Sequence, residues 1–149
     1  MAGAPEVEVR LASAAEVRPL RMRALRAGRP ASESVYPYDQ LPETLHVAAV
    51  VGEQVVGCAT VFPEPYEGLP DAWRLRGMAV DERYRGRGIG TRVMDRMKVE
   101  LAARGVRLLW CNARTVALPF YLRHGFTTEG EEFLAAHGVP HYVALLTLD

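Results

Sequence analysis

The stretch Met78–Thr91 reads MAVDERYRGRGIGT and predicts the end of a strand, a short basic turn and the glycine-rich start of a helix. Glycines alternate along the turn, at Gly86, Gly88 and Gly90. Residues without a Cβ atom let a ligand approach the backbone. The first N–H groups of a helix lack intrahelical partners and carry partial positive charge. Two arginines add full charges, Arg85 and Arg87. The stretch therefore predicts a phosphate-binding turn.

The glycine spacing narrows the kind of phosphate site. A Walker loop requires Gly-Lys-Ser/Thr, which this stretch lacks. A dinucleotide fingerprint requires G-x-G-x-x-G with an acidic residue about 20 residues later. Here the spacing is G-x-G-x-G, and Gly105 stands where the acidic residue would be sought. What remains is R-x-x-G-x-G, formed by Arg85, Gly88 and Gly90. Taken alone, this motif also fits an ordinary glycine-rich turn with solvated arginines.

A second motif lies downstream of the first. The segment Phe120–Phe126 reads FYLRHGF and contains Y-x-x-x-G-F, and Ala117 precedes Tyr121 by four residues. In this order, on a predicted strand–helix–strand–helix, the two motifs resemble those of the GNAT superfamily of acyl-CoA-dependent N-acetyltransferases. The resemblance covers essentially the whole chain, is densest over residues 74–126, and is thin over 28–45 and 127–149.

The composition is that of an ordinary globular protein. With 149 residues, 49% of them hydrophobic and 24% charged, we expect one domain spanning residues 1–149. Eighteen basic and eighteen acidic residues cancel, so the net charge does not indicate nucleic acid or a membrane surface as a partner. Residues 74–96, however, hold seven arginines against three acidic residues, a local net charge of +4. Such a patch in a neutral chain favours one small anionic ligand.

The termini and the cysteines indicate the compartment. The N-terminal residues MAGAPE have neither the basic region nor the apolar core of a signal peptide. No apolar run reaches the roughly 18 residues of a membrane span. Cys58 and Cys111 each lie in an apolar, strand-like run without metal-ligand spacing. We therefore expect a cytoplasmic protein with two buried free thiols and no metal site.

Hydrophobic periodicity and turn residues predict the element order β-α-loop-β-β-β-α-β-α-β-β. The expected strands are residues 7–11, 45–51, 54–62, 72–80, 106–111, 126–133 and 140–148, and the expected helices are 13–28, 88–104 and 116–124. Ser13 and Glu16 have the spacing of a capping box, Pro19 is tolerable only in the first turn or marks a break, and Gly105 should follow the second helix. The expected fold class is α/β (α+β), a mixed sheet with helices on both faces.

The resemblance implies a GNAT-like acyl-CoA N-acyltransferase fold with acetyl-CoA as co-substrate. The fourth and fifth strands would splay apart at their C-terminal ends, helped by a bulge, with the pantetheine arm in the gap. Backbone groups of Met78 and Val80 would pair with that arm, and an N–H near Ala79 or Val80 would polarise the thioester carbonyl and hold the oxyanion. Arg85 or Arg87 would assist the turn amides that take the pyrophosphate: Gly86, Arg87, Gly88, Ile89, Gly90 and Thr91.

The resemblance also implies a role for Tyr121, the proposed donor of a proton to the departing CoA thiolate. An unperturbed phenol, with a pKa of about 10, is protonated at neutral pH and suits this task. The alternative is an aromatic core residue with a hydrogen-bonded hydroxyl. The surrounding signature favours the catalytic role.

The sequence departs from the family pattern at two places. Many members have an Asn seven residues before this tyrosine; here that position is Arg114, and Asn112 lies at the end of the expected strand. Asn112 is the candidate pantetheine contact, with Arg114 as its alternative. Some members carry a Glu on the fourth strand as general base, where this chain has arginines. His46 and His141 are the candidate bases or substrate contacts, since His titrates near neutrality, although a lone strand histidine is more often structural.

The expected function is acetyl transfer from acetyl-CoA to a primary amine of a small molecule, by direct attack in a ternary complex. The alternatives are a non-catalytic acyl-CoA-binding or sensing module, a longer acyl donor, and acetylation of a protein amine. The acceptor site would involve the loop at 28–44, whose other interpretation is a covering loop, and the C-terminal hairpin. The sequence leaves the acceptor and the oligomeric state open, a homodimer included.

Overall fold

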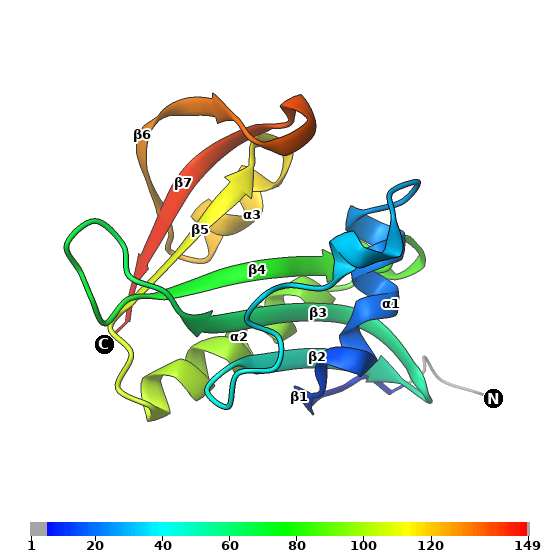
Figure 1. Cartoon of the computed structure of the whole chain (residues 1–149). Coiled ribbons are helices and arrows are strands. Elements are labelled where there is room, and N and C mark those ends of the chain that lie inside the picture. The colour runs from blue at the N-terminus through cyan, green and yellow to red at the C-terminus, as the bar shows by residue number, and fades with distance from the viewer. Residues whose placement is uncertain (1–5, 149) are drawn as a thin grey trace. The chain divides into compact units, whose positions relative to one another are not determined.

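The computed structural model describes residues 6–148 and follows the expected element order (Figure 1). The strands are β1 (Glu8–Ala12), β2 (Leu45–Val51), β3 (Gln54–Pro63), β4 (Trp73–Val80), β5 (Leu108–Arg114), β6 (Thr127–Leu134) and β7 (Pro140–Thr147). The α-helices are α1 (Ala14–Leu25), α2 (Ile89–Ala103) and α3 (Leu118–Arg123). Short 3₁₀ helices are η1 (Ala31–Ser34), η2 (Glu82–Tyr84), η3 (Thr115–Ala117) and η4 (Ala136–Gly138).

The strands form a seven-stranded mixed sheet in the order β1-β2-β3-β4-β5-β7-β6. The pairs β1–β2, β2–β3, β5–β7 and β6–β7 are antiparallel, whereas β4 and β5 are parallel, with Trp73 opposite Leu109 and Arg74 opposite Trp110. The predicted mixed sheet and parallel crossover are therefore confirmed. The splay of β4 from β5 stays a prediction.

The chain divides into two compact units. The first comprises the chain up to Phe62 together with Gly77–Val99, and the second comprises Pro63–Arg76 and the chain from Glu100 onward. Strand β4 and helix α2 each contribute residues to both units. The expectation of one domain stays a prediction.

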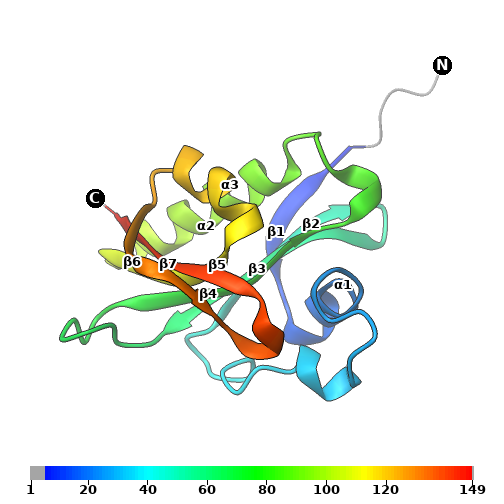
Figure 2. The ribbon, with the colours of Figure 1, turned by 90° about the horizontal axis from the view of Figure 1, so that it is seen from above.

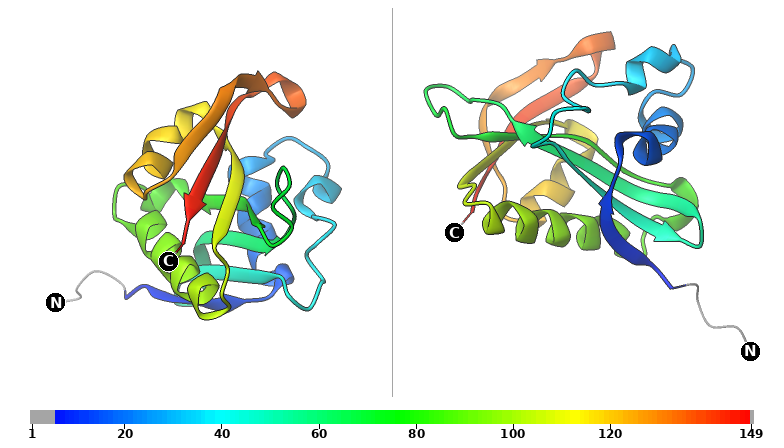
Figure 3. Two further views of the ribbon diagram at one scale, coloured as in Figure 1. Left: turned by 90° about the vertical axis from the view of Figure 1, so that its left-hand side faces the viewer. Right: turned by 60° about the horizontal axis from the view of Figure 1, so that its bottom comes forward.

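In the first unit, α1 and α2 cover opposite faces of the strands (Figures 2 and 3). Cys58 belongs to the buried cluster that contains Val17 and Leu20 of α1. A Cβ at Gly57, the preceding residue of β3, would instead lie 2.7 Å from the Ile89 side chain of α2. Because successive residues of a strand point to opposite faces, each helix has its own face. The close approach of Ile89 explains why β3 has a glycine at this position.

Helix α1 begins and continues for identifiable reasons. Ser13 accepts a hydrogen bond from the Glu16 N–H and the Glu16 side chain accepts one from the Ser13 N–H, so the capping box is confirmed. The expectation that Pro19 must lie in the first turn or mark a break is wrong, because the helix runs through it to Leu25. Apolar side chains of the helix, Val17 and Leu20 among them, pack on the sheet and hold the helix across the hydrogen bond that proline cannot make.

In the second unit, β7 lies between β5 and β6 (Figure 1). The prediction that Asn112 ends the fifth strand is wrong: β5 continues to Arg114, and Asn112 pairs with Val143 of β7. The prediction of one helix over 116–124 is refined to η3 followed by α3. Gly105 follows α2 with a φ of +73°, as predicted.

Candidate functional site

The turn that precedes α2 is exposed and has room beside its backbone. Gly86 and Gly88 both have a φ of +77°, and a Cβ built on either would meet no atom within 4 Å. Backbone in this region favours glycine, so the turn itself calls for these residues. Arg85 and Arg87 are exposed, and the Arg87 guanidinium lies 5.3 Å from the centre of the Tyr84 ring. The arrangement offers an anion both open backbone and two cations.

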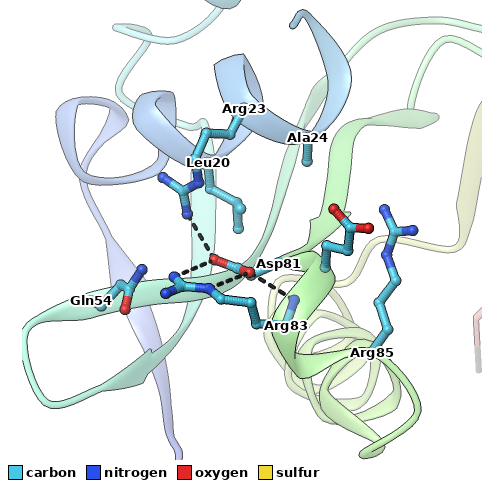
Figure 4. Close-up of a pocket in the computed structure, with 8 residues that line it drawn as sticks. Leu20, Arg23, Ala24, Gln54, Asp81, Arg83 and Arg85 are labelled. Atoms are coloured by element: carbon cyan, nitrogen blue, oxygen red, sulfur yellow. Dashed lines mark hydrogen bonds and ion pairs between the residues drawn. The ribbon is translucent and has the colours of Figure 1, made fainter.

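A buried carboxylate, Asp81, holds the start of this turn (Figure 4). Asp81 is 5% exposed, and its side chain pairs with Arg23 at 3.0 Å and with Arg83 at 3.1 Å. Its backbone N–H donates to the Val56 carbonyl at 2.8 Å. Hydrogen bonds from Arg83 are the main reason that the pKa of Asp81 is well below its usual range. Asp81 thus ties the turn to α1 and β3.

Arg85 differs from the two arginines that Asp81 holds. Its side chain points away from Asp81 in Figure 4, beside a surface hollow of about 600 Å³ between α1 and the turn. Within residues 6–148 the Arg85 guanidinium has no ion-pair or hydrogen-bond partner. Of the three turn arginines, Arg83 is therefore structural, whereas Arg85 and Arg87 are available to a ligand.

The first turn of α2 presents backbone rather than side chains. The first helical hydrogen bond runs from the Arg92 N–H to the Gly88 carbonyl at 3.1 Å, so the N–H groups of Ile89 and Gly90 before it have no intrahelical acceptor. The Ile89 side chain is 3% exposed and packs against Gly57, which leaves only its amide for a ligand. Gly90 is half-buried and Thr91 is exposed.

The C-terminal end of β4 has alternating surroundings. Ala79 is 7% exposed and belongs to the buried cluster beneath α1, whereas Met78 and Val80 are half-buried. Gly77, just before them, has a φ of +67°, and its carbonyl accepts a hydrogen bond from the Cys58 thiol at 3.4 Å. A glycine with this φ inside a strand is typical of a bulge.

In the second unit, α3 ends in a Schellman motif built from the second sequence motif. The Phe126 N–H donates to the Tyr121 carbonyl at 3.1 Å, and the Gly125 N–H donates to the Leu122 carbonyl at 3.2 Å. Gly125 has the left-handed φ that this stop requires, +94°. The Tyr121 and Phe126 rings meet edge to face, with centroids 5.2 Å apart. The Y-x-x-x-G-F spacing is therefore a helix stop that also fixes the tyrosine ring.

The Tyr121 side chain is buried but its hydroxyl is unengaged. The residue is 7% exposed, and burial raises the pKa of the phenol above its usual range, while the positive charge of Arg114 opposes that rise. Tyr121 is therefore neutral at physiological pH. Within the described part of the chain its hydroxyl has no hydrogen-bond partner, and the hydroxyl oxygen is not fully buried. The hydroxyl is free to donate to a ligand.

The two candidate cofactor contacts on β5 share one face. Asn112 and Arg114 are both half-buried, and they alternate with Cys111 and Ala113, which are buried. Residues two apart on a strand point the same way. Both thiols, Cys58 and Cys111, are buried and free as predicted, and burial raises the pKa of each to about 12.

The two candidate histidines have different surroundings. His46 is 5% exposed, and both ring nitrogens are engaged, Nδ1 with the Thr60 hydroxyl at 2.8 Å and Nε2 with the Asp39 carbonyl at 3.2 Å. His141 is half-buried on β7; its Nδ1 lies 2.7 Å from the Val139 carbonyl, and among residues 6–148 nothing bonds its Nε2. Only His141 offers an open nitrogen.

Sequence reasoning missed three residues that shape the first unit. Asp81 anchors the turn, Gly57 admits α2 to the sheet, and Arg21 is a fully buried cation. An Asp directly before a basic turn was a readable signal for the first. Gly57 and Arg21 had no local signal, because their partners lie far along the chain.

Two further properties concern only residues 6–148. No group of three or more His, Cys, Asp or Glu side chains in this range is arranged to hold a metal ion. None of the helices there is long and apolar enough to cross a membrane.

Comparison with known proteins gives a consistent result. The sequence model of the GNAT acetyltransferase domain matches residues 42–128. YitI of Bacillus subtilis (strain 168), named an uncharacterized N-acetyltransferase, is 30% identical over 129 residues, which are 85% of this chain and 87% of YitI. YjcF of the same organism, with the same designation, is 32% identical over 114 residues and 75% of each chain. An aminoglycoside 6′-N-acetyltransferase complexed with coenzyme A has the same fold, with a TM-score of 0.75, 18% identity, and coverage of 94% of this chain and 96% of that one.

Proposed function

Because the chain belongs to the GNAT acetyltransferase family, we propose that it transfers the acetyl group of acetyl-CoA to a primary amine of a small molecule. Acetyl-CoA is the co-substrate of this family. The observation that carries the proposal is the exposed turn at the start of α2, where two positive-φ glycines with open space at their Cβ positions alternate with two exposed arginines. A fold neighbour named for an aminoglycoside, a small molecule, supports the acceptor class. We treat the two units as parts of one catalytic domain.

The residues of the turn fit the pyrophosphate of acetyl-CoA. In our proposal the amides of Gly86 to Thr91 donate to its oxygens, because they precede the first helical hydrogen bond. Arg85 and Arg87 supply the neutralising charge. Asn112 contacts the pantetheine arm, with Arg114, on the same face of β5, as the alternative.

Acetyl-CoA supplies an activated acetyl thioester, and the chain's groups act on it. The backbone of Met78 and Val80 aligns the arm, and an N–H near Ala79 or Val80 polarises the carbonyl. An amine nitrogen attacks the carbonyl carbon, the C–N bond forms, and the negative charge on oxygen is held by that N–H. When the C–S bond breaks, Tyr121 gives its proton to the sulfur. The attacking nitrogen loses one proton to water or a base, and the phenolate is reprotonated.

Tyr121 suits this task because its hydroxyl is neutral and unengaged. The rings around it, including Phe126 at 5.2 Å, hold the phenol in one orientation. His141 is the candidate for an acceptor contact or base, since its Nε2 is open. His46 is assigned to the interior, where both its nitrogens are bonded.

The test is CoA release from acetyl-CoA in the presence of a panel of small primary amines. Tyr121→Phe should lower kcat by about 100-fold or more, the contribution of a positioned acid, with little change in the affinity for acetyl-CoA. Tyr142→Phe is the matched control, because it removes a hydroxyl from β7 of the same unit.

Two results would contradict the proposal. Saturable binding of acetyl-CoA with no release for any amine would indicate a binding module instead. Full activity in Tyr121→Phe would leave the acid role without support. If only peptides with a free N-terminus release CoA, the acceptor is a protein amine.

A further inference from the structure

A closed polar network lies inside the first unit, apart from the turn. Its centre is Arg21 of α1, which is 0% exposed. The guanidinium donates to both carboxylate oxygens of Asp39, at 2.8 and 2.9 Å, and to the Ser34 carbonyl at 3.0 Å. It also donates to the Thr60 hydroxyl, which lies 2.8 Å from His46 Nδ1. An arginine with this many bonds has one position, because a planar fork between two carboxylate oxygens cannot rotate.

The same guanidinium is in contact with strand β4. Arg21 lies over the Tyr36 ring, 3.9 Å from its centre. A Cβ at Gly77 would lie 3.0 Å from Arg21 Nε and 3.2 Å from the Tyr36 ring, so both groups lie directly against the backbone there. Arg21 Nε is fully buried and has no hydrogen-bond partner. Arg21 is thus held against Gly77 although one of its buried donors stays unpaired, which is rare in folded proteins.

Gly77 is the point at which β4 departs from regular strand geometry, with a φ of +67°. The Cys58 thiol bonds the Gly77 carbonyl, so the peptide group after this residue is fixed on one side. The next three residues are Met78–Val80. Any rotation at Gly77 would therefore redirect the amide and carbonyl groups of Met78–Val80.

We propose that Arg21 is a positioning residue for acetyl transfer. Its guanidinium fixes the bulge at Gly77. It thereby holds the backbone of Met78–Val80 in the orientation that contacts the thioester. This inference rests on the proposed function, in which that backbone aligns the pantetheine arm and polarises the carbonyl. It adds that the orientation of this backbone is determined by a buried side chain that does not touch the substrate.

Arg21→Lys is the main variant, because it retains the positive charge beside Asp39 but loses the planar fork and the contact with Gly77. Arg10→Lys is the matched control: Arg10 pairs with Glu16 at 2.6 Å at the start of α1, on the surface. Three quantities are measured for each: kcat with an active amine, the affinity for CoA without the acetyl group, and the carbonyl signal of bound acetyl-CoA labelled with ¹³C.

For Arg21→Lys we expect kcat to fall at least about tenfold, part of what one carbonyl-polarising donor supplies. The carbonyl signal should move toward that of free acetyl-CoA, and the affinity for CoA should change less than about twofold, because the phosphate turn is untouched. Arg10→Lys should leave all three unchanged. A folded Arg21→Lys protein with a lower Tm, but with normal kcat and a normal carbonyl signal, would reduce the network to a structural role and overturn the proposal.

Gly77→Ala perturbs the same point from the other side, since its Cβ would press on Arg21 and Tyr36. It should also weaken the carbonyl signal, and combining it with Arg21→Lys should add little, because both act on one geometry. Fully additive effects would contradict a shared geometry. If Arg21→Lys does not fold, Gly77→Ala alone decides, and a normal signal overturns the proposal.

The carbonyl signal separates this inference from the proposed function. A wild-type protein that binds acetyl-CoA and shifts its carbonyl, but acetylates no amine, would refute the transfer and still test Arg21. A wild-type protein that binds no acetyl-CoA would refute both.

Discussion

Arg21 and Arg85 belong to the same unit and carry the same charge, but their surroundings are opposite. Arg21 is 0% exposed and bonds three residues through its terminal nitrogens. Arg85 is exposed, and within residues 6–148 its guanidinium bonds none. The difference lies in the carboxylates: Asp39 holds Arg21, and Asp81 holds Arg23 and Arg83. An arginine without a carboxylate partner is the one left for an anionic ligand.

The net charge of residues 74–96 overstates the positive charge that is available to a ligand. The +4 of residues 74–96 counts all arginines alike, but Arg74 pairs with Glu64, Arg83 with Asp81, and Arg96 bonds the Val9 carbonyl. Charge that is already paired or bonded contributes less to ligand binding. The proposed phosphate site therefore has fewer available charges than the arginine count suggests. Four predictions test the contrast between the buried and the exposed arginines.

The largest effect should come from breaking the buried pair. Asp39→Asn leaves the Arg21 cation unpaired in the interior, and we expect a loss of about 3 kcal/mol or more in the free energy of unfolding. The measurement is urea denaturation. Glu33→Gln is the control, because it breaks the exposed Arg29–Glu33 pair of 2.9 Å and should cost at most about 1 kcal/mol. Equal losses in the two variants would show that burial does not distinguish the pairs.

The next effect should appear at the exposed turn. Gly88→Glu places a carboxylate where phosphate is expected, and we expect the affinity for CoA to fall about 100-fold, or roughly 2.7 kcal/mol. Gly28→Glu is a close control, since Gly28 also has a φ of +77° and open space around its Cβ position. Both variants should lose similar stability from the strained backbone. Calorimetric titration with CoA should separate them, and an equal loss of affinity would refute the phosphate turn.

A smaller effect should follow from removing the free charges singly. Arg85→Ala and Arg87→Ala should each weaken CoA binding about 3- to 10-fold at low salt, and less at high salt, because exposed charges are screened. Their free energy of unfolding should stay within about 0.5 kcal/mol of that of the wild type. Arg29→Ala removes the same charge from the exposed pair with Glu33 and should not change the affinity. Binding that is insensitive to salt and to both turn variants would mean that the backbone alone holds the ligand.

The sequence predicted the order of the elements well because their causes are local. The capping box joins Ser13 to Glu16, three residues apart, and the tyrosine motif is a helix stop within six residues. Even so, the motif's physical basis, a Schellman stop with Phe126 against Tyr121, became visible only in the structure.

The buried Arg21 network and the surroundings of His46 could not be predicted, because the residues that form them lie far apart in the sequence. Arg21 bonds residues 18 and 39 positions away, so its burial has no local signature. His46 was a candidate base or substrate contact because histidine titrates near neutrality, although a lone strand histidine is more often structural. Its role changes once Thr60 and Asp39 are seen to engage both nitrogens.

The smallest effect should be a pH dependence of the free energy of unfolding, caused by His46 in the buried Arg21 network. The Asp39 carbonyl only accepts, so His46 donates from Nε2 and takes the Thr60 proton at Nδ1, which requires the neutral ring. Burial lowers the pKa of His46, and the nearby Arg21 charge lowers it further. The unfolded chain, with a pKa of about 6.5, therefore binds the proton more readily than the folded protein.

Stability from His46 should thus be complete above about pH 6.5 and should decrease as the pH falls from there toward its folded pKa. His46→Gln should flatten this part of the unfolding free energy against pH. An unchanged slope in His46→Gln would mean that the network tolerates a charged imidazole. The exposed arginines Arg85 and Arg87 would not be affected, because Asp39 and Thr60, which contact His46, bond the buried Arg21.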